Sequence, residues 1–461
     1  MIERELDPTH PRPEALVRAS EGDSSRDEAA ELVRHLLSGC EVCAQSLQDA
    51  LSPSAPSESP AGLGGSDPAT AMKTYGPGLD RARRLFQKSL SAFQEERVQA
   101  RRELDRLAKT PLDQWEPLLL GEPRFQTWAL VLLLLEECQR LYPRNPAHAF
   151  ELSRLADLLS QRLDEERYGK QRLFDLRART QCALGTVHRI NTDYHEAEGH
   201  FQRAKELLEA GTGDPIEKAE ILIHEAVLNA HQARYSRAFA LLEHATRIAR
   251  RFEDRHLEGK ALVTKGVYLS FVDQEEKALQ ALYTGIELLD TEREPRLLLV
   301  AWHNIFFCLS YVGRNEEALQ KLPYVRSLHE KFGNRMDLLR LHWVEARIKA
   351  DFGHWHEAEK AFKAVREAFI EAGIGYEAAQ VSLDLASLYL RQGRSDRVAG
   401  LAREMLPIFK SRDVHREALA ALLVFQQAVE QETFNSQLVA EIEQYLRQAR
   451  NDPSLRFQPS S

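Results

Sequence analysis

The sequence has 461 residues, of which 43% are hydrophobic and 28% charged, so the chain can bury a large core. Its formal net charge is −9, but residues 1–60 hold 5 basic and 12 acidic side chains and so carry −7 of it. The remaining 401 residues are nearly neutral, which excludes a whole-chain electrostatic attraction to nucleic acid or to an anionic membrane.

No export signal or membrane span is expected from the sequence. Met1–His10 is acidic and lacks the apolar core of a signal peptide. The longest strongly apolar run, Trp128–Leu135, is eight residues long and too short to cross a bilayer. Five cysteines without an export signal favour a reducing compartment. We therefore expect a cytoplasmic protein in which Cys138, Cys182 and Cys308 are small core residues.

The first segment, residues 1–51, contains a compact set of metal-binding residue types. Cys40 and Cys43 form a Cys-x-x-Cys turn that can bring two thiolates to one metal ion. His35 lies about one helical turn upstream, and His10 could supply a fourth ligand. The pattern predicts a structural zinc site formed by His10, His35, Cys40 and Cys43. The alternatives are a bare turn with free thiols and a site that has lost its metal.

This segment resembles the zinc-binding module of the zinc-containing anti-sigma factors, which have a His-x3-Cys-x2-Cys motif. Here the spacing is His-x4-Cys-x2-Cys, with Gly39 as the apparent extra residue. The resemblance implies a small helical module whose partner would be a sigma factor.

Residues 52–78 are rich in Ser, Pro, Gly and Ala, and this composition predicts a flexible linker. A helical cap and a divergent first repeat are expected over residues 79–170. They begin with a helix over 79–107 and continue with a helix pair over 125–142 and 147–163. Residues 450–461 are expected to form a disordered tail.

An internal repeat occupies residues 171–449. Small or apolar residues recur at intervals of 41 and then 40 residues, and we call them the marker row: Ala197, Ala238, Ala278, Ala318, Ala358, Val398 and Leu438. Apolar or small residues also follow each marker after four and seven positions, as on one face of a helix. Twelve residues before each marker lies an early row of mostly small residues: Gly185, Ala226, Gly266, Phe306, Ala346, Ala386 and Gln426. The pattern predicts seven helix pairs.

The turn within a pair is marked by glycine. Gly313, Gly353 and Gly393 each lie five residues before a marker, where glycine permits the left-handed conformation that ends a helix. Pro215 and Pro295 lie where first helices are expected to begin, a position at which proline loses no hydrogen bond.

These units resemble the tetratricopeptide repeat (TPR), and the best match is Leu184, Gly185, Ala197, Phe201 and Ala204. The resemblance implies an all-α fold, a right-handed α-solenoid of helix-turn-helix repeats, here about 40 residues long. A HEAT-type α-solenoid is the alternative. Both kinds of repeat build an extended surface that binds other proteins.

No catalytic motif is convincing. His195 and His200 resemble a metalloprotease pair, but they are five residues apart, which places them on different sides of a helix. We therefore expect no enzyme; an enzyme with a hidden active site is a remote alternative.

The expected function is that of a protein–protein interaction scaffold or adaptor that binds a peptide or partner protein, with neither nucleic acid nor membrane as partner. The alternative is a soluble anti-sigma-like transcription regulator with a repeat region that senses a signal. In the TPR pattern, the concave face is formed by first-helix positions at fixed offsets from the early row. The resemblance thereby selects as partner-binding residues Arg179, Arg189, His231, Lys260, Phe271, His303, Phe307, Tyr311, Arg340, Trp343, Arg347 and Arg391. This set is basic and aromatic, so an acidic partner segment with apolar anchors is expected, although Glu220 and Asp351 occupy the same offsets.

Overall fold

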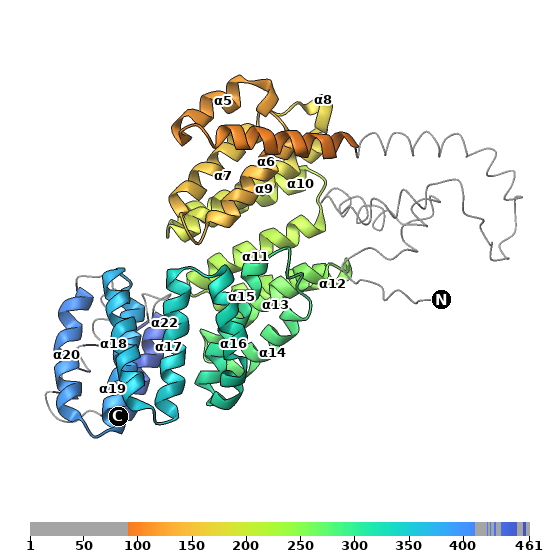
Figure 1. Cartoon of the computed structure of the whole chain (residues 1–461). Helices are drawn as coiled ribbons and strands as arrows, with labels where there is room; N and C mark the ends of the chain where they lie inside the picture. The colour runs from red at the N-terminus through yellow and green to blue at the C-terminus, as the bar shows by residue number, and fades with distance from the viewer. Residues whose placement is uncertain are drawn as a thin grey trace, which may run out of the picture. The chain divides into compact units, whose positions relative to one another are not determined.

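The computed structural model describes residues 91–410, 422, 425, 428–429, 435–449 and 455–457. The predicted zinc module, the predicted linker and residues 79–90 lie outside these ranges. The described residues form helices, turns and loops, without a strand (Figure 1). They divide into two compact units: the first ends at Leu184 and includes Ala210–Thr212, and the second holds Gly185–Glu209 and the chain from Gly213 onward.

The first unit contains the predicted helix pair. Its elements in chain order are a helix over 91–107, η1 (Leu112–Gln114), α5 (Trp115–Gly121), η2 (Pro123–Phe125), α6 (Trp128–Leu141), α7 (Pro146–Ser160), α8 (Glu165–Tyr168) and the first part of α9 (Lys170–Ile190). The side chains of Thr127 and Asn145 cap α6 and α7. The buried carboxylate of Glu96 accepts hydrogen bonds from the Ala129 backbone and the Tyr168 hydroxyl, which ties the helix over 91–107 to α6 and α8.

The second unit is a stack of helix pairs. After the end of α9, its helices in order are α10 (Tyr194–Ala210), α11 (Pro215–His231), α12 (Tyr235–Arg251), α13 (Arg255–Ser270), α14 (Glu275–Ile286), α15 (Pro295–Tyr311), α16 (Asn315–Phe332), α17 (Arg335–Asp351), α18 (Trp355–Glu371), α19 (Gly375–Arg391), α20 (Ser395–Lys410) and α22 (Ser436–Ala449). From α11 to α20 each helix packs against the next, and each first helix also packs against the following first helix. The predicted all-α repeat fold of TPR-like helix pairs is confirmed.

Helix packing explains the 40-residue spacing that recurs along this chain. The marker residues from Ala197 to Val398 are fully buried. At the early row, a Cβ added to Gly185 would lie 2.9 Å from the Phe201 ring, and one added to Gly266 would lie 2.6 Å from Leu282. Small residues are therefore required where the two helices of these units cross.

The turns inside the pairs share one backbone conformation. The residues five before the first six markers all have positive φ, between 56° and 80°: Thr192, Ala233, Asp273, Gly313, Gly353 and Gly393. The prediction from the three glycines is confirmed, and it extends to three units in which another residue adopts the same left-handed conformation. The strain of a Cβ at such a position is of the order of 1 kcal/mol.

Replacing Gly353 with alanine is expected to lower the free energy of unfolding by about 1 kcal/mol, because φ at this residue is +80°. The matched control is Gly199→Ala inside α10, where an added Cβ would meet nothing within 4 Å. Alanine favours the helix there, so this variant should be more stable by about 0.5–1 kcal/mol. Urea unfolding followed by circular dichroism measures both; shifts of the same sign would contradict the assignment of the turn.

The last described helix, α22, packs differently from the second helices of the earlier pairs. The marker Leu438 is only half-buried, while the next residue, Val439, is 1% exposed. α22 packs against α19, and its Val439, Ile442 and Leu446 join a core shared with α17, α18 and α20. The helix α22 therefore lies beside first helices of earlier units (Figure 1).

Two further observations bear on the sequence expectations. Cys138, Cys182 and Cys308 are buried, as predicted, and burial raises the pKa of the Cys138 thiol to about 11. In the part of the chain that the structure describes, no helix has both the length and the apolar character required to traverse a membrane.

Candidate partner-binding face

Eleven of the twelve side chains that the repeat offsets select, from Arg189 to Arg391, belong to the second unit, and we call them the first-helix face. In the second unit these side chains contact one another and their neighbours. Arg189 Nη1 lies 3.3 Å from His231 Nε2. The His231 ring makes edge contacts with Tyr194 and Tyr268, at 6.4 and 6.3 Å between ring centres. Phe271 packs on Tyr268 at 5.8 Å, and half-buried Arg179 belongs to the first unit.

Lys260 is neutralised inside the stack. Its ammonium lies 3.0 Å from a Glu220 oxygen and 2.9 Å from a Glu294 oxygen, and its side chain is 14% exposed. Burial alone would lower the pKa of Lys260, but the two carboxylates outweigh it and raise that pKa above its usual value. Glu220 and Lys260 occupy the same offset in consecutive units, so the pair crosses from α11 to α13.

His303 forms a neutral pair with His329. The Val325 carbonyl, 2.8 Å from His329 Nδ1, can only accept a hydrogen bond, so Nδ1 carries the proton. His329 Nε2 then accepts from His303 Nδ1 across 3.2 Å. Burial lowers the pKa of His303 to about 3, and the neighbouring His329 and Arg340 add to the effect while Asp337 opposes it.

The stability of the repeat stack should therefore fall in mild acid. Between the ordinary pKa of 6.5 and the folded-state pKa of about 3, the unfolded chain binds a proton at His303 that the folded chain excludes. As the pH is lowered through this window, the free energy of unfolding decreases. The contribution of His303 to this decrease is about 1–2 kcal/mol at pH 5. Urea unfolding at pH 7.5 and pH 5 should show a smaller loss in His303→Gln than in the wild type. Equal losses would contradict the prediction.

Two other arginines of the set form ion pairs, one with the buried Glu377 and one with an exposed carboxylate. Arg340 lies 3.1 Å from Glu377, and Arg391 lies 2.8 Å from Asp351, with both partners of the second pair 42% exposed. Each pair joins one first helix to the next. The basic character predicted for the face is thus balanced by carboxylates of the chain itself.

The densest contacts surround Arg347. Its Nη1 donates to Asp384 Oδ1 at 2.8 Å and to Glu443 Oε1 at 2.7 Å. Its guanidinium carbon lies 3.9 Å from the centre of the Tyr311 ring, whose hydroxyl also donates to Glu443. Trp343, 6% exposed, donates its indole hydrogen to Asp384. Phe307 packs on Tyr311 at 4.4 Å.

Two carboxylates share this one guanidinium. Burial raises the pKa of Asp384 to about 7; Arg347 opposes the rise, and the nearby Glu443 adds to it. Burial also acts to raise the pKa of Glu443, but Arg347 outweighs it and the pKa is lowered. Asp384 comes from α19 and Glu443 from α22, so the cluster connects α15, α17, α19 and α22.

The sequence offsets found the basic and aromatic members of this cluster but not its acids. Asp384 lies two residues before the early-row residue Ala386, an offset that the pattern does not select. Glu443 is 96 residues from Arg347, and nothing in the repeat indicates that α22 returns to α17. These ion pairs can therefore be identified only from the three-dimensional structure, not from the repeat pattern.

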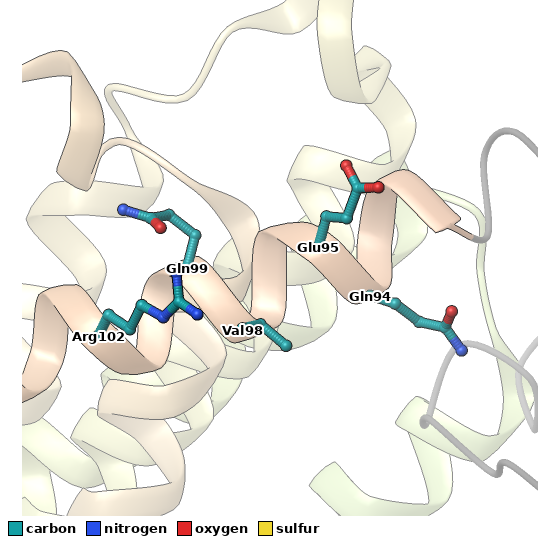
Figure 2. A pocket seen from close by; sticks show the side chains of 5 residues that line it. All are labelled: Gln94, Glu95, Val98, Gln99 and Arg102. Atoms are coloured by element: carbon teal, nitrogen blue, oxygen red, sulfur yellow. The ribbon is translucent and has the colours of Figure 1, made fainter.

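A shallow pocket of about 460 Å³ lies along the helix over 91–107, but its geometry does not make a site. Figure 2 shows the five side chains that line it: Gln94, Glu95, Val98, Gln99 and Arg102. All five come from one helix and are exposed, so they cannot enclose a ligand.

Among the described residues, no group of three or more His, Cys, Asp or Glu side chains is arranged to hold a metal. His200 stacks on His188 at 5.0 Å between ring centres. The predicted zinc ligands His10, His35, Cys40 and Cys43 lie outside the described residues, so the zinc site stays a prediction from sequence.

No family model and no curated protein matches the sequence. Solved structures that are similar to it in fold include the following two. One is a Rap protein complexed with competence and sporulation factor, 16% identical, covering 68% of this chain and 99% of its own, with a TM-score of 0.40. The other is aspartyl phosphate phosphatase F from Bacillus subtilis, 17% identical, covering 81% of this chain and 96% of its own, with a TM-score of 0.40.

Proposed function

We propose that this chain is a protein–protein interaction scaffold or adaptor that binds a peptide or a partner protein along the first-helix face. One observation carries the proposal: in the second unit that face already holds a helix, because α22 contacts Tyr311 of α15 and Arg347 of α17. A surface of stacked first helices that accepts one amphipathic helix has the shape and chemistry to accept another.

The ion pairs described above support this function by fixing the side chains of the face. Lys260, Arg340 and Arg347 are each held by carboxylates from neighbouring helices. Because these side chains are ordered before binding, a partner meets a preformed surface and less conformational entropy is lost on association.

Site-specific photocrosslinking tests the location of the binding face. A photoreactive amino acid replaces Arg391 at the end of first helix α19 or, as a matched control, Arg403 on second helix α20; both arginines are exposed. The full chain carrying the label at position 391 is expected to give a crosslinked partner from lysate, identifiable by mass spectrometry. A partner crosslinked only from position 403 would contradict binding along the first-helix face.

From sequence alone, we also propose that residues 1–51 bind one structural zinc ion. The support is the Cys40–Cys43 turn with His35 and His10 upstream. Elemental analysis of the purified full chain is expected to find about one zinc per chain. A Cys40→Ser/Cys43→Ser double variant should lose it. Full occupancy in that variant, or a wild-type chain without zinc, would refute this site.

A further inference from the structure

The last described helix returns to a turn more than 160 residues earlier in the chain. Gln444 and Gln448 each donate to Asp273 at 2.8 Å, and Arg447 lies 2.6 Å from Asp273 and 3.3 Å from Glu275. With the contacts of Glu443, these interactions define a receiving surface that we call the α22 seat: Asp273, Glu275, Tyr311 and Arg347.

The α22 seat is complementary in charge to Glu443 and Arg447 of α22. Glu443 and Arg447 are four residues apart and therefore lie on the same side of α22, one turn from each other. Glu443 meets Arg347 and the Tyr311 hydroxyl, whereas Arg447 meets Asp273 and Glu275. A helix that reversed this order would place each charge beside a like charge, so the seat selects direction as well as sequence.

The rest of α22 presents an apolar stripe. Val439, Ile442, Leu446 and Ala449 are at most 1% exposed and belong to the core built with α19. The seat thus holds one side of an amphipathic helix while α19 holds the other. This is the helix-in-groove mode of recognition, in which apolar anchors supply affinity and flanking charges supply specificity.

The seat would keep its shape without α22. Without α22, Arg347 would still form its ion pair with Asp384, which belongs to α19. The side chain of Asp273, in the turn before α14, is 24% exposed, and that of Glu275, the first residue of α14, is 14% exposed, so water can replace Arg447 in part. In addition, Glu443 places a second carboxylate on the guanidinium that Asp384 already occupies, and two like charges at one cation oppose each other. The hydrogen bonds that Gln444 and Gln448 donate to Asp273, and the contact of Arg447 with the Tyr311 ring, each contribute little net energy.

We propose that the α22 seat is an exchangeable receptor for an amphipathic helix with a carboxylate followed four residues later by an arginine, and that α22 is the intramolecular occupant that such a partner helix displaces. This inference rests on the proposed function and specifies both the partner's chemistry and its regulation. α22 acts as a competitor at high effective concentration because it is part of the same chain. Only a partner that reproduces its charge pattern and apolar stripe can replace it.

The test uses the full chain and a fluorescein-labelled synthetic peptide with the sequence of residues 435–449. Arg447→Glu in the chain places a carboxylate beside Asp273 and Glu275 and should release the intramolecular helix. Fluorescence anisotropy is expected to show that this variant binds the peptide at least about tenfold more tightly than the wild type. A peptide carrying the same Arg-to-Glu replacement should not bind.

Three further chains separate exchange from unfolding. Arg403→Glu makes the same charge change at an exposed position of α20 and should bind the peptide like the wild type. The pair Asp273→Arg/Arg447→Glu restores an opposite-charge contact and should return binding to the wild-type level. Gln444→Ala/Gln448→Ala removes two hydrogen bonds to Asp273 without a charge change and should raise binding to an intermediate level. Circular dichroism checks that each chain stays helical.

Each outcome decides the proposal. Failure of both Arg447→Glu and Gln444→Ala/Gln448→Ala to bind the peptide more tightly than the wild type would overturn it and make α22 a permanent part of the stack. An equal increase in Arg403→Glu would also overturn it. If the peptide fails but crosslinking from position 391 still captures a partner, the exchange of α22 is wrong and the proposed function stands. If the peptide binds as expected and position 391 captures nothing while position 403 does, the location of the proposed partner face is wrong.

Discussion

Replacing Arg347 with alanine is expected to lower the free energy of unfolding of the repeat stack by about 3–5 kcal/mol, the effect of leaving buried charges without their counter-charge. Asp384 and Glu443 would both lose the guanidinium that lies 2.8 and 2.7 Å from them. Their side chains are 9% and 15% exposed, so water can compensate only in part. Urea unfolding at pH 7.5, followed by circular dichroism, measures the loss.

The matched control for Arg347 is Arg391→Ala. Arg391 also pairs with a carboxylate of a neighbouring first helix, but both members of that pair are 42% exposed. An exposed pair contributes little, so the control should lose less than about 1 kcal/mol. Asp384→Asn combined with Arg347→Ala should recover part of the loss, because one uncompensated carboxylate is removed. Equal losses for Arg347→Ala and Arg391→Ala would contradict a buried ion cluster.

Replacing Phe362 with alanine is expected to destabilise the same stack by about 3–5 kcal/mol, the range for truncating a buried aromatic ring. Phe362 follows its marker Ala358 by four residues on α18 and is 1% exposed. It lies in the core to which α17, α18, α19, α20 and α22 contribute, where close packing means that truncating the ring leaves a cavity.

The control for Phe362 is an exposed phenylalanine of the same repeat. Phe352, ten residues earlier, is 44% exposed at the turn between α17 and α18. Phe352→Ala should change the free energy of unfolding by no more than about 0.5 kcal/mol. If Phe352→Ala were as destabilising as Phe362→Ala, the marker row would not define the core face of the second helices.

The fold could be predicted because its determinants are local. The 40-residue interval, the spacing of four and seven from each marker, and Gly353 at its turn are all readable without knowing any long-range contact. The close approach of Gly185 to Phe201 and of Gly266 to Leu282 explains physically why the early row is small. Burial of Ala197 and its equivalents follows from the same periodicity.

The candidate site could be predicted only in part, because its contacts are not local. The offsets selected Tyr311, Trp343 and Arg347, which the structure brings together. They gave no sign that Asp384 and Glu443 would neutralise Arg347, since the second contact spans 96 residues. A period identifies which side of a helix is inward, but it does not determine which later helix lies against that side.

A distance between α22 and α14 in the full chain tests most directly whether α22 can leave its seat. Nitroxide labels are introduced through an unnatural amino acid at exposed Gln437 of α22 and exposed Lys277 of α14, and pulsed electron spin resonance records their separation. The wild-type chain is expected to give a single narrow distribution of distances, and Arg447→Glu a broad distribution shifted to longer distances, because α22 leaves its seat. A broad distribution in the wild-type chain, or one that Arg447→Glu leaves unchanged, would contradict it.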